Sequence, residues 1–120
     1  MLELAARWDA ATGDGDGDAM AELAEPSLAF WHNHDDLEVG LEGTIRTIAW
    51  LRRTVPDLEW HDVDVQPTPT GWVAQKVMIG AAPGGPLRAH TCVVVTVSDR
   101  GRVARVAEYL DPAALAVLTA

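Results

Sequence analysis

The segment Leu41–Gln66, LEGTIRTIAWLRRTVPDLEWHDVDVQ, contains the change of pattern that decides the fold class. Its first half has the spacing of a helix with one apolar stripe, formed by Leu41, Ile45, Ile48 and Ala49. That helix should stop before Pro56, because proline disfavours helical geometry in the residue before it. The pattern then alternates residue by residue, with Leu58, Trp60, Asp62 and Asp64 on one side and Glu59, His61, Val63 and Val65 on the other. The segment therefore predicts a helix followed directly by a strand.

The rest of the chain places two more helices before this segment and further strands after it. Helical spacing covers residues 2–12, and a second helix capped by Asp16 or Asp18 should end at Pro26. Residues 28–32, LAFWH, are predicted as a short strand, and the polar stretch NHDDLEVGLEG after them as a loop. Four consecutive strands are expected at 58–66, 72–81, 87–97 and 102–110, followed by a last short helix after Asp111. Helices grouped before a run of strands predict an α+β fold, as a single domain over residues 1–120.

The charge balance restricts the partners of the protein. Nine basic against eighteen acidic residues give a net charge of −9. Nucleic acids and anionic membrane surfaces are therefore not expected as partners, because both require a positive surface. The N-terminus lacks the basic and hydrophobic regions of a signal peptide, so a cytoplasmic location is expected. The single cysteine, Cys92, lies in an apolar run and is predicted to be an inert thiol.

The stretch Thr12–Leu23, TGDGDGDAMAEL, has two interpretations. Its aspartates have part of the spacing of a helix–loop–helix calcium site. The position that needs glycine for a sharp turn is Ala19, however, and residues 19–24 have a helical pattern. We therefore expect a corner between two helices, with an aspartate capping the second.

His32, His34 and Glu38 have the spacing H-x-H-x-x-x-E, which is similar to the first metal motif of cupins. Imidazoles two residues apart on a strand point the same way and could share a metal ion. Helices rather than strands precede the motif, and the residues after His90 do not supply the second cupin motif. We predict no metal, and a histidine-ligated metal protein remains as an alternative.

The order and spacing of three pieces resemble the nuclear transport factor 2-like superfamily and, within it, the SnoaL-like proteins. The pieces are RWDAATGDGDGDAMAELAE, FWHNHDDLEVGLEGTIRTIAWLRRTVPDLEW and SDRGRVARVAEYLDPAAL. The resemblance covers nearly the whole chain. It implies three N-terminal helices packed in a strongly curved antiparallel or mixed sheet that forms a conical pocket. It also implies a homodimer through the outer face of the sheet, where Trp60 and Trp72 are expected.

Members of this superfamily include ketosteroid isomerase, limonene epoxide hydrolase and polyketide cyclases. The resemblance places His32 where the isomerase has its proton-shuttling aspartate, and Trp8 where it has an oxyanion-binding tyrosine. Nothing acidic stands in CVVVTV, where the isomerase has its second oxyanion donor. Glu108 falls at the last aspartate of the aspartate–arginine–aspartate set of the epoxide hydrolase. The other two positions of that set would lie in WVAQKVMIG, which offers only Gln75 and Lys76.

A candidate site follows from these positions. Alternation puts Val106, Glu108 and Leu110 on one face of the last strand, where burial would raise the pKa of Glu108 and make it a general acid. His32 would act as the base from the opposite rim. Together with Val106 and Leu110, the residues expected to shape an apolar cavity or assist in it are Trp8, Trp31, Trp50, His90 and Tyr109.

The predicted function is acid–base chemistry on a small apolar carbonyl or polycyclic compound, without a cofactor. The reaction could be an isomerisation, a cyclisation or a dehydration. A non-catalytic ligand-binding or dimerisation module of the same fold is the main alternative. The sequence does not name the substrate.

Overall fold

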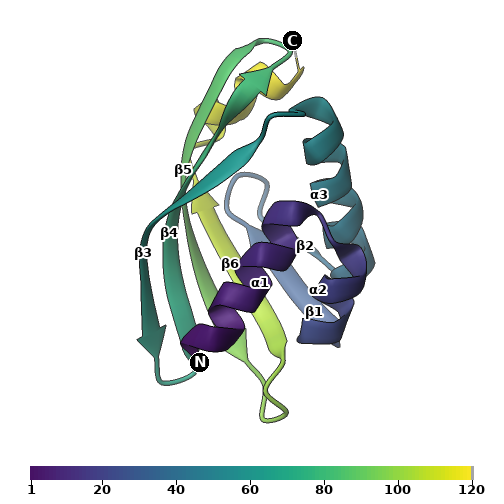
Figure 1. The fold of residues 1–120 in the computed structure, drawn as a ribbon, viewed down its shortest axis with the longest axis vertical. Coiled ribbons are helices and arrows are strands. Elements are labelled where there is room, and N and C mark those ends of the chain that lie inside the picture. The colour runs from purple at the N-terminus through teal and green to yellow at the C-terminus, as the bar shows by residue number, and fades with distance from the viewer. Residues whose placement is uncertain (120) are drawn as a thin grey trace.

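The structure is a computed structural model that describes residues 1–119, and it has three helices on one side of a six-stranded sheet (Figure 1). The helices are α1 (Leu2–Asp14), α2 (Gly17–Leu23) and α3 (Leu41–Thr54), and a short 3-10 helix, η1 (Pro112–Thr119), follows the last strand. The strands are β1 (Ala24–His32), β2 (Leu37–Val39), β3 (Glu59–Thr68), β4 (Gly71–Ala82), β5 (Gly85–Val97) and β6 (Val103–Leu110). The α+β class predicted from the period change is confirmed.

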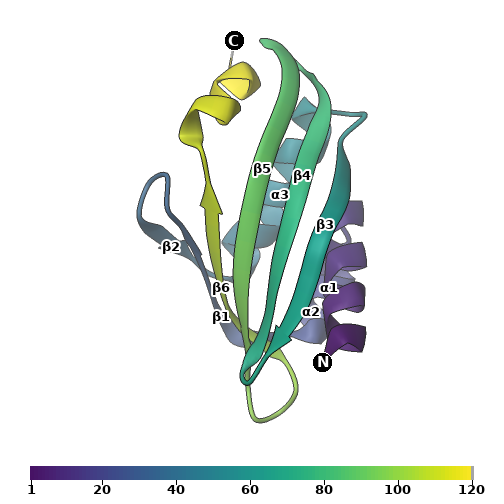
Figure 2. The same cartoon turned by 90° about the vertical axis from the view of Figure 1, so that its left-hand side faces the viewer.

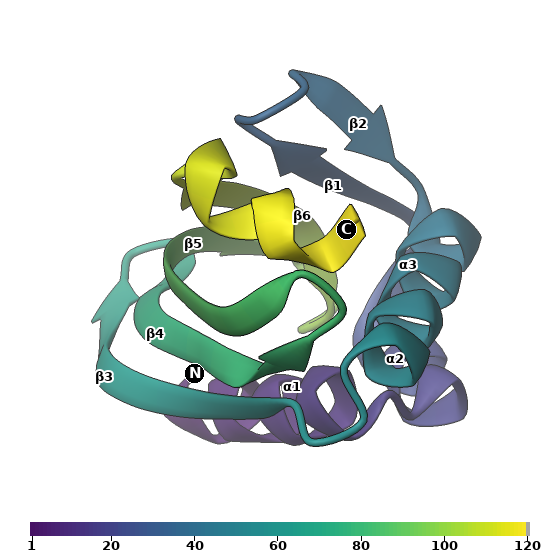
Figure 3. The same ribbon diagram turned by 90° about the horizontal axis from the view of Figure 1, so that it is seen from above.

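The sheet has the strand order β2-β1-β6-β5-β4-β3, in which only β1 and β6 run parallel. Seen from above, the sheet curls without closing, and α1 and α3 lie across its open side (Figure 3). The view turned by 90° shows the long strands β4 and β5 in front, with the helices behind them (Figure 2). The curved mixed sheet around three helices agrees with the fold that the resemblance implied.

Two separate hydrophobic cores stabilise the two ends of this shell. At one end, Trp8 and Met20 of the first two helices pack against Trp72, Val95 and Val106 of the sheet. At the other end, the second core consists of Val55, Leu58, Met78, Leu87, Ala89 and Leu118. The interior between the two cores is where a ligand could be enclosed.

The corner between α1 and α2 has no calcium-loop geometry. Gly15 takes a left-handed conformation with φ 68°, and Asp16 caps α2 by accepting a hydrogen bond from the Ala19 amide at 3.1 Å. Residues 17–23 are helical, so they cannot form the extended part of such a loop. The prediction of a capped corner is therefore confirmed.

Two local predictions were wrong. The second helix ends at Leu23, and Pro26 lies inside β1, at a place where the register with β6 shifts and no ladder hydrogen bond from a proline is needed. The polar stretch after His32 is not all loop, because Leu37–Val39 turns back as β2 and pairs with β1. A hairpin of this kind has too few apolar residues to be found by periodicity.

A bulge in β3 makes the predicted assignment of its two faces wrong. Asp62 pairs with Lys76 and Asp64 with Gln75, so Val63 has no partner and is 63% exposed. Beyond the bulge Val65 returns to the inner face. Trp60 and Trp72 also lie on the inner face and not on the outer one where a dimer contact was expected; Trp72 is 1% exposed.

No helix in the described part of the chain is long and apolar enough to cross a membrane.

Candidate functional site

A cavity of about 210 Å³ is lined by residues of both cores, together with residues of α3 and His34 in the β1–β2 hairpin. Its walls are mostly apolar and aromatic, and they include Trp8, Phe30, Trp50, Trp60, Trp72, Met78, Val106, Leu110 and Leu118. Five ionisable side chains line it: His32 from β1, His34 from the turn after β1, Lys76 from β4, Glu108 from β6 and Asp9 from α1. An apolar pocket with a few convergent polar groups is the usual form of a small-molecule site.

His32 and Glu108 face each other across the parallel pair β1–β6, because the register puts them directly opposite on the inner face. His32 Nε2 lies 3.7 Å from Glu108 Oε1, and the two side chains are only 17% and 15% exposed. The His32 ring also stacks on Phe30, with ring centroids 4.8 Å apart. One imidazole and one carboxyl group are thus held together in a largely dry place.

Asn33 fixes this register at the ends of the two strands. Its side-chain amide donates to the Leu110 carbonyl at 3.1 Å and accepts from the Leu110 amide at 3.0 Å. Its backbone amide donates to the Glu108 carbonyl at 3.1 Å. These three bonds tie Asn33, the residue after His32, to Glu108 and Leu110 of β6. They therefore fix His32 opposite Glu108.

Burial moves both groups of the pair towards their neutral forms. It raises the pKa of Glu108 from 4.5 to about 7, although the nearby Lys76 charge acts in the opposite direction. Burial also lowers the pKa of His32 below 6.5, with a further contribution from His34 and an opposing one from Asp35. At pH 7 about half of the Glu108 carboxyl groups therefore carry a proton, beside an imidazole that is mostly unprotonated.

Lys76 and Asp9 are site residues that the sequence analysis missed. The Lys76 ammonium makes a close ion pair with the Asp9 carboxylate and lies 5.9 Å from the centroid of the Trp60 ring. Burial lowers the pKa of Lys76 to about 8, while Glu108 acts to raise it. The alternation of Trp72, Ala74, Lys76 and Met78 could have revealed this lysine, since its neighbours on that face are all apolar.

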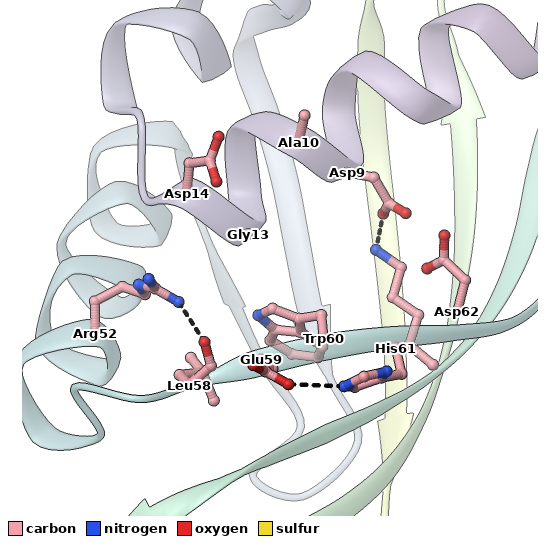
Figure 4. Close-up of a pocket in the computed structure, with 11 residues that line it drawn as sticks. Asp9, Ala10, Gly13, Asp14, Arg52, Leu58, Glu59, Trp60, His61 and Asp62 are labelled. Carbon is pink, nitrogen blue, oxygen red and sulfur yellow. Dashed lines mark hydrogen bonds and ion pairs between the residues drawn. The ribbon is translucent and has the colours of Figure 1, made fainter.

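The Asp9–Lys76 pair also borders a second hollow, an outer groove of about 570 Å³ between α1 and β3 (Figure 4). Asp9, Leu58, Trp60 and Lys76 line both the groove and the cavity. Around the groove, Arg52 donates to the Leu58 carbonyl at 2.8 Å, and Glu59 pairs with His61 at 3.0 Å (Figure 4). The ion pair therefore stands at the boundary between interior and surface.

The residues expected in the pocket divide into two groups. Trp8, Trp50, Val106 and Leu110 line the cavity together with His32 and Glu108. Trp31, His90 and Tyr109 lie on the outer face instead, because each is next in sequence to an inward residue. Trp31 donates to Asp36 Oδ1 at 2.7 Å and packs edge-on against Tyr109, and His90 is exposed.

Of the residues in the H-x-H-x-x-x-E spacing, His32 and His34 lie side by side with ring centroids 5.4 Å apart, but Glu38 does not join them. His34 Nε2 lies 3.5 Å from Asp35, and Glu38 pairs with Arg105 at 2.9 Å on the outer face. Within residues 1–119, no three side chains of His, Cys, Asp or Glu are arranged to hold a metal ion. The hairpin directs Glu38 away from His32, because Glu38 pairs with Trp31.

Comparison with known protein families gives a match to the SnoaL-like domain over residues 5–106. The chain belongs to the SnoaL-like family. No curated protein matches the sequence.

Several solved structures share the fold. IdmH, a candidate polyketide cyclase from Streptomyces antibioticus, is 18% identical with a TM-score of 0.83, and the match covers 99% of this chain and 98% of IdmH. A candidate SnoaL-like polyketide cyclase from Jannaschia Sp. CCS1 is 22% identical with a TM-score of 0.82, and the match covers 99% and 92% of the two chains. PrhC from Penicillium brasilianum NBRC 6234 is 14% identical with a TM-score of 0.82, over 94% and 81%. At these identities the similarity defines the fold alone.

The raised pKa of Glu108 predicts how stability depends on pH. The folded chain holds the proton of this carboxyl group more tightly than the unfolded chain does, so stability falls as pH rises from about 4.5 towards 7. Glu108→Gln removes this contribution. Relative to wild type, the variant should gain about 2 to 3 kcal/mol in unfolding free energy between about pH 4 and about pH 8.

Urea unfolding of both proteins at the two pH values measures this difference. Glu59→Gln is the matched control, because it makes the same substitution at a side chain that is 64% exposed. A difference for Glu108→Gln that stays constant across the range would contradict the assignment.

Proposed function

We propose that this SnoaL-like protein is a cofactor-independent acid–base enzyme that acts on a compact apolar carbonyl compound. His32 takes a proton from a carbon next to the carbonyl group, and Glu108 gives a proton to the carbonyl oxygen. The observation that carries the proposal is the His32–Glu108 pair, 3.7 Å apart and facing into an apolar cavity. The reaction class is an isomerisation, cyclisation or dehydration through an enol.

The protonation states support these roles. An imidazole with a pKa below 6.5 is free to accept a proton near neutrality, and a carboxyl group with a pKa of about 7 still carries one to donate. Transfer of both protons leaves an imidazolium beside a carboxylate. The short distance between the two groups and the Lys76 charge then stabilise the ionised pair.

The size and lining of the cavity support a compact, flat ligand. Its volume of about 210 Å³ is below the range of roughly 300–1,000 Å³ that is common for drug-sized ligands. Trp8, Trp50 and Trp72 offer aromatic surfaces to such a ligand. The structural relatives described as candidate polyketide cyclases favour a carbonyl-bearing substrate.

Exchange of protons next to a carbonyl tests the proposal without knowledge of the substrate. The wild-type protein should accelerate deuterium incorporation into the flat bicyclic ketone 2-tetralone in D₂O, followed by proton NMR. His32→Gln and Glu108→Gln should each slow the protein-dependent exchange by roughly a hundredfold or more, because each removes one partner of the proton transfers. The rate should fall below the pKa of His32, where the base is protonated, and above about pH 7, where Glu108 loses its proton.

His90→Gln is the matched control for His32→Gln, because His90 lies exposed on the outer face. It should exchange at the wild-type rate. Equal rates in the wild type and both cavity variants would defeat the proposal and favour a non-catalytic binding module.

We also propose that the protein forms a homodimer through the outer face of its sheet. Trp60 and Trp72 are excluded from this face, but other apolar side chains gather on it. Val94 lies opposite Ala107 and Val73 in the neighbouring strands, and Tyr109 lies opposite Cys92. Val94 and Tyr109 are 40% and 48% exposed. An exposed apolar patch of this kind suits a two-fold contact between identical copies.

Val94→Glu should convert the dimer to a monomer, because it places a charge in the middle of the contact. Sedimentation-velocity centrifugation of the wild type and the variant measures the change. Val63→Glu introduces the same charge at an exposed position of edge strand β3 and should remain dimeric. A monomeric wild-type protein would contradict the proposal.

A further inference from the structure

Lys76 is the only lysine in a chain that has eight arginines. It is 9% exposed, and its neighbours on the inner face of β4 are Ala74 and Met78. Its charge is therefore taken out of water in a place where a methionine or leucine would fill the same space without a desolvation penalty. An arginine would make a stronger ion pair with Asp9 than lysine does. What lysine alone offers is an amine that can lose its proton and react.

The position of the amine gives a small molecule access to it. Lys76 lines the interior cavity, as Glu108 does, and it also lines the outer groove. Asp9 holds the end of the side chain, which fixes where the amine lies. A carbonyl compound in the cavity can thus meet the amine and the Glu108 carboxyl group at once.

We propose that Lys76 is a nucleophile that forms a covalent imine with a compact aldehyde or ketone bound in the cavity. This activity goes beyond proton transfer by the His32–Glu108 pair, although it rests on the same cavity and on Glu108 as a proton donor. The ligand class is an apolar carbonyl compound with one or two rings.

The reaction balances with the amine, the carbonyl compound and Glu108 alone, and it needs no further reactant. The neutral amine adds to the carbonyl carbon, and a proton moves from nitrogen to oxygen to give a carbinolamine. Glu108 protonates the hydroxyl group, which leaves as water, and the nitrogen lone pair forms the C=N bond of a protonated imine. Addition of water reverses each step and restores the amine and the carbonyl compound.

The surrounding charges determine when the amine is neutral. Burial lowers the pKa of Lys76 to about 8, which makes it reactive near neutral pH in a way that an ordinary lysine is not. The charged and titratable side chains that line the cavity or the groove together with it are Asp9, Asp14, His32, His34, Arg52, Glu59, His61, Asp62 and Glu108. Among these, Asp9 makes the direct contact and favours the protonated amine.

Reductive trapping with benzaldehyde and sodium cyanoborohydride tests the inference on the intact protein. The reagent reduces the protonated imine to a stable secondary amine, so each trapped site gains one benzyl group. Because the chain has a single lysine, mass spectrometry of its peptides distinguishes Lys76 from the exposed α-amine at Met1. At about pH 7.5 the folded protein should be labelled at Lys76 at least about tenfold faster than the same chain in concentrated urea, since the unfolded lysine has a pKa near 10.4.

Two variants separate reactivity from folding. Lys76→Arg keeps the charge and should show no label in its β4 peptide. Asp9→Asn removes the carboxylate that favours the ammonium form, and it should be labelled several times faster than wild type at the same pH, an effect that loss of structure would not produce. Failure to label Lys76 in the folded wild type, or labelling no faster than in urea, would overturn the inference.

The result is independent of the exchange experiment. Labelling of Lys76 without deuterium exchange would keep the imine chemistry and defeat the acid–base proposal. Exchange without labelling would keep the acid–base proposal and defeat the imine inference.

Discussion

The parallel pairing of β1 with β6 is the constraint on which the site depends. These two strands are far apart in the sequence, and they are the only parallel neighbours in the sheet. Their register places His32 opposite Glu108, and a slip of one residue would turn His32 outward and bring Trp31 inward. Asn33 secures the register at one end. At the other, Glu25 at the start of β1 accepts from Ser98 at 2.7 Å in the turn before β6.

The cavity combines an apolar enclosure with groups that are unfavourable inside it. Two hydrophobic cores carry the stability of the shell, and neither needs His32, Lys76 or Glu108. Burial shifts the pKa of all three towards the neutral form, which means that each has a desolvation penalty in its charged state. Residues that lower stability in this way are typical of a functional site and not of a core. Both proposed reactions depend on the same effect of burial on pKa. The cavity shifts the pKa of His32, Glu108 and Lys76 so that they can act near neutral pH as base, acid and nucleophile, respectively.

The sequence predicts the fold and half of the site. The period change after Pro56 and the spacing of the helices give the α+β class, and alternation along β6 gives the inward face of Val106 and Glu108. The same alternation rule fails at β3, because a bulge at Val63 reverses the faces of the residues after it, and no residue type in the sequence indicates this bulge. Trp31 and Tyr109 point outward because each is next in sequence to His32 or Glu108, so alternation along the strand already excludes them from the cavity, whereas the face of His90 depends on long-range pairing that a single sequence does not reveal. Lys76 and Asp9 meet only because α1 lies across the open side of the sheet, so their pair could not be found from spacing along the chain.

The central claim is that the dry cavity raises the pKa of Glu108 and lowers that of His32, so that a protonated carboxyl group and an unprotonated imidazole coexist near pH 7. The most direct measurement is an NMR titration of the wild-type protein that follows the side-chain carboxyl carbon of Glu108 and the ring nitrogens of His32. The structure predicts that Glu108 titrates near pH 7 and His32 below pH 6.5. A Glu108 that titrates at about pH 4.5, as an exposed glutamate does, would contradict the account.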